Sequence, residues 1–184
     1  YRSSQCGRNF EYMGEDPYLA ARMVENYVTG MQGTGTMACL KHFLCNNTEF
    51  LRKLSNSIVD ERAIMEIYTP AFKAGIDAGA GSVMTSYNLV NGEWAGQSKY
   101  VITDLLRGTL GFKGLVMSDW NATEQCSYAE AINAGNDLIM PGTPAVTKQL
   151  EKDLKTGVLY RDALNLSAGR VLELIFKSDT CKEF

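Results

Sequence analysis

Short apolar runs alternate with longer helical segments along the chain, and this alternation constrains the fold more than any other feature. Four runs have the length and composition of strands. They are residues 37–44, 82–87, 115–118 and 136–140. Each is followed by a loop and then by apolar residues at helical spacing. Strands and helices that alternate in this way form parallel sheets with helices packed outside them, so we predict an α/β fold.

Helical spacing predicts the segments that separate these strands. Pro17 suits a first helical turn, whereas Pro70 is expected to kink or split its helix. The pair Asn91–Gly92 predicts a turn, and residues 45–57 are expected to form a polar loop. The predicted helices cover residues 17–32, 60–79, 100–110, 128–134, 144–156 and 160–176.

The length and the strand count together predict an incomplete barrel. The chain has 184 residues, whereas a closed (β/α)8 barrel needs eight strands and typically about 250 residues. We therefore predict one partial domain over residues 1–184, roughly the second half of a TIM-type barrel. A half barrel exposes strand edges, so a missing half, a second copy or another domain should cover them. The first residues, Tyr1–Cys6, are typical of a cut inside a longer chain.

Composition excludes several classes of partner. The net charge is −3 and the Lys and Arg residues are scattered, which argues against nucleic acid. No apolar run is long enough to span a bilayer, so no membrane partner is expected. The five cysteines are odd in number and lack C-x-x-C spacing. We expect free, mostly buried thiols, which favour a reducing compartment, rather than disulfides or a zinc site.

The stretch of residues 114–120 is an apolar run that ends in Ser118, Asp119 and Trp120, and this ending is the strongest functional signal. Barrel enzymes carry their chemistry at the C-terminal ends of strands. A carboxylate beside an indole suggests a sugar site, where the ring stacks on the sugar and the carboxylate faces the reacting carbon. The alternative is that Asp119 caps the following loop. Asp137, at another strand end, is expected to be structural.

Residues at the ends of the first two strands could complete such a site. Lys41 and His42 can donate hydrogen bonds to sugar hydroxyls, although adjacent strand residues point to opposite faces unless the strand turns. A buried histidine and a snorkelling lysine are the alternative. Met84 and Tyr87 close the next strand, where such residues usually belong to the core. The Tyr87 hydroxyl could instead point at a carboxylate nucleophile.

Two arginines in predicted loops could each have either a surface role or a role in the site. Arg52 could form a solvated ion pair with Glu49 or reach into the site. Arg8 could be a surface charge or a planar donor held by Glu11. A nucleophilic carboxylate must be ionised, so cationic donors should surround it. Lys41, Arg8 and Arg52 are the candidates.

Several segments, in this order, form a recognisable set: residues 7–11 with 15–17, 41–52, 60–68, 82–92, 111–120 and 134–142. They include Lys-His-Phe, Ser-Val-Met-Thr-Ser-Tyr-Asn, Ser-Asp-Trp and Met-Pro-Gly. Together they resemble glycoside hydrolase family 3, in its β-glucosidase-type branch, and the resemblance covers nearly the whole chain.

The resemblance implies a retaining glycosidase with Asp119 as the nucleophile that forms the glycosyl-enzyme. It implies that hydroxyls of the first sugar subsite are bound by Arg8, Lys41, His42 and Arg52. It also implies that the pocket is lined by Met84, Tyr87 and Trp120. The expected reaction is removal of terminal, non-reducing β-D-glucose or a similar sugar. No metal or organic cofactor is implied, because two carboxyl groups suffice for the chemistry.

The sequence departs from the family pattern in what it lacks. In the glucosidase branch a separate α/β sandwich domain supplies the acid/base glutamate, and this chain shows no such domain. The loop after His42 has no further histidine, which excludes the acid of the N-acetylglucosaminidase branch. The resemblance also implies an upstream segment, with a carboxylate that grips the outer sugar hydroxyls, which we expect to precede residue 1. We therefore expect the isolated chain to be nearly inactive and to need a missing domain or a second chain.

Two other classes of function fit the same residues. The chain could be a non-catalytic or partner-dependent sugar-binding half-barrel module, in which two halves associate to bury their edges. It could also be a different barrel enzyme, such as an aldolase that uses Lys41 as a Schiff-base amine.

Overall fold

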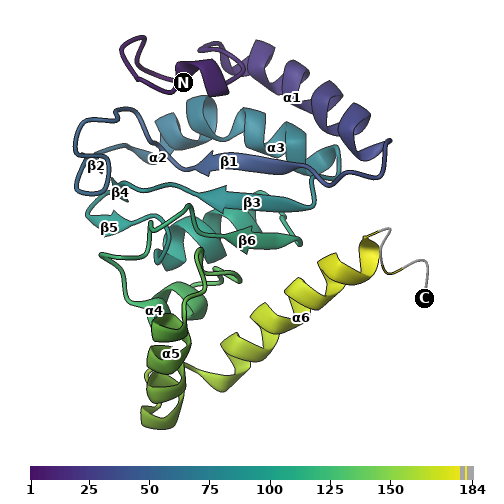
Figure 1. Ribbon diagram of the computed structural model, residues 1–184. Coiled ribbons are helices and arrows are strands. Elements are labelled where there is room, and N and C mark those ends of the chain that lie inside the picture. Colours follow the sequence, from purple (N-terminus) through teal and green to yellow (C-terminus); the bar gives the residue numbers. More distant parts are fainter. Residues whose placement is uncertain (179–180, 182–184) are drawn as a thin grey trace.

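The computed structural model describes residues 1–178 and 181, and a three-stranded parallel sheet lies at its centre (Figure 1). The strands are β1 (Cys39–Phe43), β3 (Ser82–Thr85) and β6 (Leu115–Met117), in the order β1-β3-β6. Their spatial order follows the chain order. The predicted fourth strand is reduced to one parallel bridge between Met117 and Leu138, which extends the same series. The predicted α/β fold with a parallel sheet is confirmed.

Helices cross between the strands at the predicted places. The first is α1 (Pro17–Gln32), which packs on α3 (Pro70–Asp77). The predicted 60–79 segment begins at the N-cap Asp60, whose side chain accepts from the Ala63 N–H. Pro70 splits this segment, because it cannot donate a backbone hydrogen bond. The elements before the split are α2 (Glu61–Ala63) and the π-helix η2 (Ile64–Tyr68), and a second π-helix is η3 (Tyr100–Thr109).

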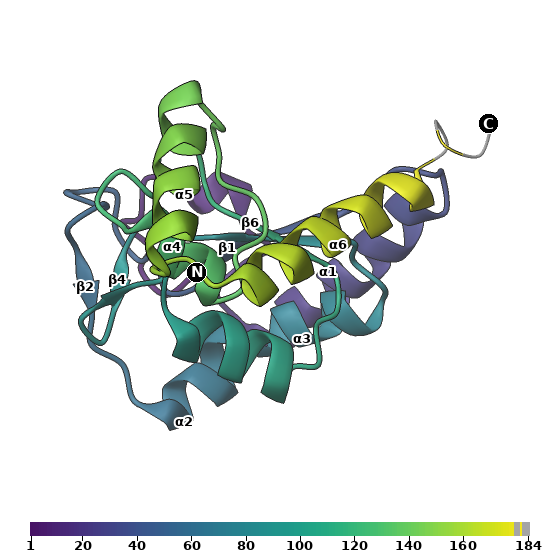
Figure 2. The same cartoon turned by 90° about the horizontal axis from the view of Figure 1, so that it is seen from below.

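The C-terminal part adds three helices: α4 (Tyr128–Asn133), α5 (Pro144–Thr156) and α6 (Arg161–Lys177). All three had been predicted within about one residue. A separate small core of buried side chains joins them; it includes Ile132, Val146 and Leu159. From this core α5 and α6 diverge in different directions (Figure 2). None of the described helices combines the length and the apolar character needed to cross a membrane.

Sequence periodicity missed a second, smaller sheet. It consists of β2 (Asn56–Ser57), β4 (Leu89–Val90) and β5 (Glu93–Trp94). The predicted turn at Asn91–Gly92 joins the last two as a hairpin, and β2 lies within the segment expected to be only a loop. Two-residue strands are too short to show an alternating pattern. A single 3-10 turn, η1 (Asn9–Glu11), precedes α1.

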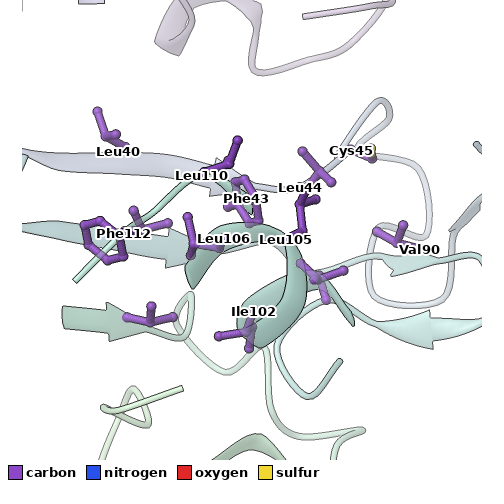
Figure 3. Packing of buried hydrophobic residues seen from close by; sticks show 14 of the residues in the cluster. Leu40, Phe43, Leu44, Cys45, Val90, Ile102, Leu105, Leu106, Leu110 and Phe112 are labelled. Carbon is purple, nitrogen blue, oxygen red and sulfur yellow. The ribbon is translucent and has the colours of Figure 1, made fainter. Parts of the chain in front are cut away.

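The main core fills the space between the sheet and the helices, as Figure 3 shows. Phe43 from β1 packs edge-on against Phe72 of α3, with ring centroids 4.9 Å apart. Ile102 and Leu106 are fully buried on the inner side of η3. Burial of side chains this large stabilises the fold by about 1.5–3 kcal/mol each. The strand ends that follow are therefore held on a rigid base.

A buried ionic cluster fixes the strand that precedes Asp119. The Asp137 carboxylate is fully buried and accepts from Arg107 at 2.6 Å and from Arg170 at 2.9 Å. It also accepts from the backbone N–H of Val116 in β6 at 2.8 Å. Because each charge has a partner, this burial is tolerated. The expectation that Asp137 is structural agrees with these contacts.

The cysteine prediction is confirmed in one part and wrong in another. All five side chains are free thiols. Only Cys6 and Cys45 are buried, however, and Cys39 is exposed on β1. Cys39 lies on the same face of β1 as the exposed Lys41, whereas Leu40 between them points into the core.

We expect Gly114→Ala to destabilise the fold by at least ~2 kcal/mol. An added Cβ would overlap the carbonyl oxygen of Gly81 and lie 2.8 Å from the Phe112 ring, at the entry to β6. Gly169→Ala is the matched control, because a Cβ there meets nothing within 4 Å and alanine favours a helix by about 1 kcal/mol. Urea unfolding followed by circular dichroism measures both. Equal stability of the two variants would contradict this packing.

Candidate active site

The candidate site lies where the three central strands end. His42 belongs to the last part of β1, Tyr87 follows β3 by two residues, and Asp119 follows β6 by two residues. Because the strands are parallel, their C-terminal ends meet at one edge of the sheet. Side chains 77 positions apart in sequence, those of His42 and Asp119, thereby come into contact.

The two oxygens of the Asp119 carboxylate have different surroundings. Oδ1 accepts from the Tyr87 hydroxyl at 3.1 Å and from the Trp120 backbone N–H at 2.6 Å. Oδ2 is buried and has no hydrogen-bond partner among the described residues. The residue is only 7% exposed, so this free oxygen lies in a largely desolvated position. One oxygen anchors the side chain, and the other has no hydrogen-bond partner among the described residues.

Two nitrogen donors face the free oxygen. His42 Nε2 lies 3.3 Å from Asp119 Oδ2, but the two atoms are not aligned for a hydrogen bond. Arg8 Nη1 lies 3.7 Å from the same oxygen. Arg8 is held by Glu11, which accepts from Nε at 2.6 Å and from Nη2 at 2.8 Å. This bidentate pair orients the guanidinium toward Asp119, as expected for a planar donor held by Glu11.

Lys41 reaches the same cluster but does not contact Asp119. Its ammonium pairs with Glu11, so Glu11 bridges Lys41 and Arg8. The β1–β3 register shifts between Leu40 and Phe43, which is the strand irregularity needed for Lys41 and His42 to act together. Schiff-base chemistry uses a desolvated amine, whereas the Lys41 side chain is 37% exposed and ion-paired. The aldolase alternative therefore has no support here.

Arg52 also differs from the expected arrangement. Its Nη1 pairs with Glu49 at 2.7 Å, and its Cζ lies 4.0 Å from the centre of the Tyr87 ring. The prediction that Lys41, Arg8 and Arg52 all surround the Asp119 carboxylate is wrong for Lys41 and Arg52. The physical reason is that nearer carboxylates take both cations. Arg52 instead lies over the face of the Tyr87 ring, as a cation–π contact.

The two remaining predicted residues lie at the margin of this cluster. Met84 is half-buried in β3 and pairs with Met117 of β6, two positions before Asp119. Trp120 binds the carboxylate through its backbone, while its side chain is 56% exposed. The backbone oxygen of Trp120 also accepts from the Tyr87 hydroxyl at 2.7 Å. An exposed indole beside a carboxylate is free to stack on a ligand.

Sequence reasoning missed Tyr12, and it saw Glu11 only as a partner for Arg8. The Tyr12 hydroxyl lies 2.6 Å from His42 Nδ1, and the two rings meet edge to face at 5.8 Å. Tyr12 stands in an irregular segment after η1, where neither periodicity nor a nearby partner in sequence marks it. Only the chain path that returns α1 to β1 brings it beside His42.

The charges in the cluster set distinct protonation states. The hydrogen bond from Arg8 and the contact with Lys41 lower the pKa of Glu11 to about 2. Burial, and then the Asp119 charge, raise the pKa of Tyr87 to about 12, so its hydroxyl stays a donor. Burial and the nearby Arg8 lower the pKa of His42 below its usual range. At neutral pH the site holds two guanidinium groups, a neutral imidazole and an ionised Glu11.

A groove of about 390 Å³ adjoins the cluster. Apolar side chains of α1 and α3, among them Val24, Val28 and Phe72, form part of its wall. Tyr12 and His42 also line it, so the imidazole stands between this groove and Asp119.

The chain matches the model of the glycosyl hydrolase family 3 N terminal domain over residues 1–174. It is 40% identical over 177 residues to thermostable beta-glucosidase B from Acetivibrio thermocellus. The matched region covers 95% of this chain and 23% of that protein. It is 42% identical over 181 residues to beta-glucosidase B from Emericella nidulans. That matched region covers 96% of this chain and 21% of the relative. The chain thus spans less than a quarter of the length of these relatives.

Solved structures of beta-glucosidases also superpose on this chain. Beta-glucosidase 3B from Thermotoga neapolitana, in complex with glycerol, superposes with a TM-score of 0.93 at 36% identity. That match covers all of this chain and 27% of the other. The same protein in complex with glucose gives a TM-score of 0.91 at 37% identity, with 97% and 26% covered.

We expect Glu11→Gln to remove a pH-dependent part of the stability. The pKa of Glu11 lies below its ordinary value, so its contribution is complete above pH 4.5 and is lost as the pH falls toward 2. The stability gap between wild type and variant should therefore shrink over this interval, as measured by urea unfolding at several pH values.

Glu66→Gln is the control, because Glu66 forms an exposed ion pair with Arg62 that contributes under about 1 kcal/mol. A Glu11→Gln gap that stays constant from pH 5 to pH 2 would contradict the cluster described here.

Proposed function

This chain belongs to glycosyl hydrolase family 3, and from that premise we propose that it carries the nucleophile side of a retaining β-glucosidase site. The reaction is removal of terminal, non-reducing β-D-glucose or a similar sugar. One observation carries the proposal: Asp119 is anchored through Oδ1, while its buried Oδ2 faces His42 and Arg8 without a hydrogen bond.

In the proposed first step, Asp119 Oδ2 attacks the anomeric carbon. The new C–O bond forms as the bond to the leaving oxygen breaks, and that oxygen takes a proton from a general acid. Water then attacks the same carbon, its proton passes to the group that acted as the acid in the first step, and the C–O bond to Asp119 breaks to release the carboxylate. Tyr87 and the Trp120 N–H hold Oδ1 throughout, so Oδ2 can point at the sugar without rotating. Because the carboxylate is already oriented, less entropy is lost on reaching the transition state, which lowers the activation free energy of this step.

The general acid is proposed to come from outside this chain. Glu11 has a pKa of about 2 and is ionised at neutral pH, so it has no proton to donate. Tyr87 has a pKa of about 12, and its one hydroxyl proton is already shared between Asp119 Oδ1 at 3.1 Å and the Trp120 backbone oxygen at 2.7 Å. The large share of the relatives that lies beyond this chain leaves room for an acid supplied by another segment.

Four side chains are proposed to hold the sugar hydroxyls. Arg8 and His42 lie next to Asp119 Oδ2, and Lys41 joins them through Glu11. Arg52 would approach over the Tyr87 ring. Trp120 and Met84 would contribute apolar contacts to the sugar. A β-glucosidase of 37% identity has been solved in complex with glucose, which supports a sugar of this class.

We further propose that the chain is a single partial domain, the later part of a (β/α)8 barrel. The strands β1, β3 and β6 and the Leu138 bridge follow one another in chain order, which is the order in a barrel. Exposed apolar side chains on α1 and α6, such as Tyr27 and Phe176, support a further covering element. If that element belongs to another chain, the domain could act as a partner-dependent sugar-binding module.

Kinetics with a series of leaving groups test the nucleophile assignment. An absent general acid costs about 10²–10⁴-fold for a poor leaving group. We therefore expect the 184-residue chain to turn over 2,4-dinitrophenyl β-glucoside, which needs no acid, far faster than methyl β-glucoside. Asp119→Asn should abolish this activity, whereas Asp104→Asn, an exposed carboxylate on η3, should leave it unchanged.

Two results would count against the proposal. Full activity on methyl β-glucoside would show that the acid lies within the chain. Glucose binding without turnover of any glucoside would favour the sugar-binding module.

A further inference from the structure

The two ring nitrogens of His42 have different neighbours. Nε2 lies beside Asp119, and Nδ1 lies beside Tyr12. The Tyr12 hydroxyl lies 2.6 Å from Nδ1, and Asp119 Oδ2 lies 3.3 Å from Nε2. The ring is therefore bracketed by two oxygens, and its side chain is only 1% exposed. A neutral imidazole carries one proton, so one nitrogen donates and the other accepts. Which nitrogen carries the proton decides what the ring offers to a ligand.

The two possible arrangements are not equivalent. If Nδ1 carries the proton, it donates to the Tyr12 oxygen, and the lone pair of Nε2 faces the lone pairs of Asp119 Oδ2. Two acceptors 3.3 Å apart in a buried position repel each other. If Tyr12 donates to Nδ1, the Nε2–H faces the carboxylate instead, which is favourable. Burial raises the pKa of Tyr12, so its hydroxyl retains the proton that this arrangement needs.

We propose that Tyr12 is a positioning residue that fixes His42 as the Nε2–H tautomer and so places a donor, rather than a second acceptor, beside Asp119 Oδ2. The charged groups that face His42 are Arg8, Lys41, Glu11 and Asp119. Arg8 and Lys41 are both paired with Glu11, so neither takes the Nδ1 lone pair. Tyr12 alone among the described contacts occupies that nitrogen.

The consequence concerns the ligand, and it rests on the proposed function. With Nε2–H beside a free carboxylate oxygen, the site offers one donor and one acceptor next to each other. A single sugar hydroxyl satisfies both, because it accepts from Nε2 and donates to Oδ2. The other tautomer would present two acceptors, and a hydroxyl could satisfy only one of them. Tyr12 thereby tunes the site for a hydroxyl rather than for a cation or a purely accepting group.

The chain has a single histidine, so the tautomer can be measured without any activity. The experiment is ¹⁵N NMR of the 184-residue chain labelled in its histidine ring. We expect Nε2 at a protonated, pyrrole-type shift and Nδ1 at a pyridine-type shift displaced by an accepted hydrogen bond. In Tyr12→Phe, which keeps the ring, Nδ1 should lose that displacement and some Nδ1–H tautomer should appear.

Tyr68→Phe is the matched control, because the Tyr68 hydroxyl lies in the same groove but bonds to Asn47 rather than to His42. It should leave both signals unchanged. A wild-type proton on Nδ1, or a wild-type Nδ1 without a hydrogen-bond displacement, would overturn the inference even if Tyr12→Phe did not fold. An Nδ1 signal that is the same in Tyr12→Phe and wild type would do so as well.

Titration with D-glucose separates this inference from the proposed function. If glucose binds beside His42, the Nε2 signal should move more than the Nδ1 signal. If the Nε2–H tautomer is present and depends on Tyr12, but glucose moves neither signal, the inference stands and the proposed function loses its support.

Discussion

The anchoring of one Asp119 oxygen by Tyr87 and by the Trp120 N–H is the interaction on which the site depends. It commits Oδ1 to the protein and leaves Oδ2 without a partner in a nearly buried position. An unpaired buried carboxylate oxygen is costly unless something satisfies it. The protein supplies only near neighbours, His42 Nε2 and Arg8, at distances that leave the interaction incomplete. Under the proposed function, the sugar supplies the partner that Oδ2 does not find among the described residues.

The rest of the fold holds that carboxylate in place. Strand β6 is tied to its neighbours by the parallel ladder and by the Asp137 cluster, whose carboxylate accepts from Val116 inside the strand. The cations around the site are in turn restrained by Glu11 and Glu49. Each positive side chain thus has a carboxylate that fixes its direction, so the pocket is pre-organised rather than assembled by the ligand.

Much of this could be predicted from the sequence, because it rests on local pattern. The helices at 17–32 and 144–156 and the strand that ends just before Asp119 follow from periodicity and from Pro and Gly positions. What could not be predicted depends on contacts between distant segments. Tyr12 meets His42 only through tertiary packing, and Lys41 was expected at Asp119 but pairs with Glu11. The sequence shows which side chains carry a positive or a negative charge. Which of them form ion pairs depends on the three-dimensional structure.

Covalent trapping tests the central claim most directly. The chain would be incubated with 2,4-dinitrophenyl 2-deoxy-2-fluoro-β-glucoside, whose leaving group needs no acid, and then digested with trypsin. The account predicts one fluoroglucosyl group on the peptide of residues 114–148, with fragmentation placing it on Asp119. A label on a different carboxylate, such as Glu11 or Asp137, or a chain that binds glucose yet takes no label, would contradict the assignment of the free Asp119 oxygen as the attacking atom.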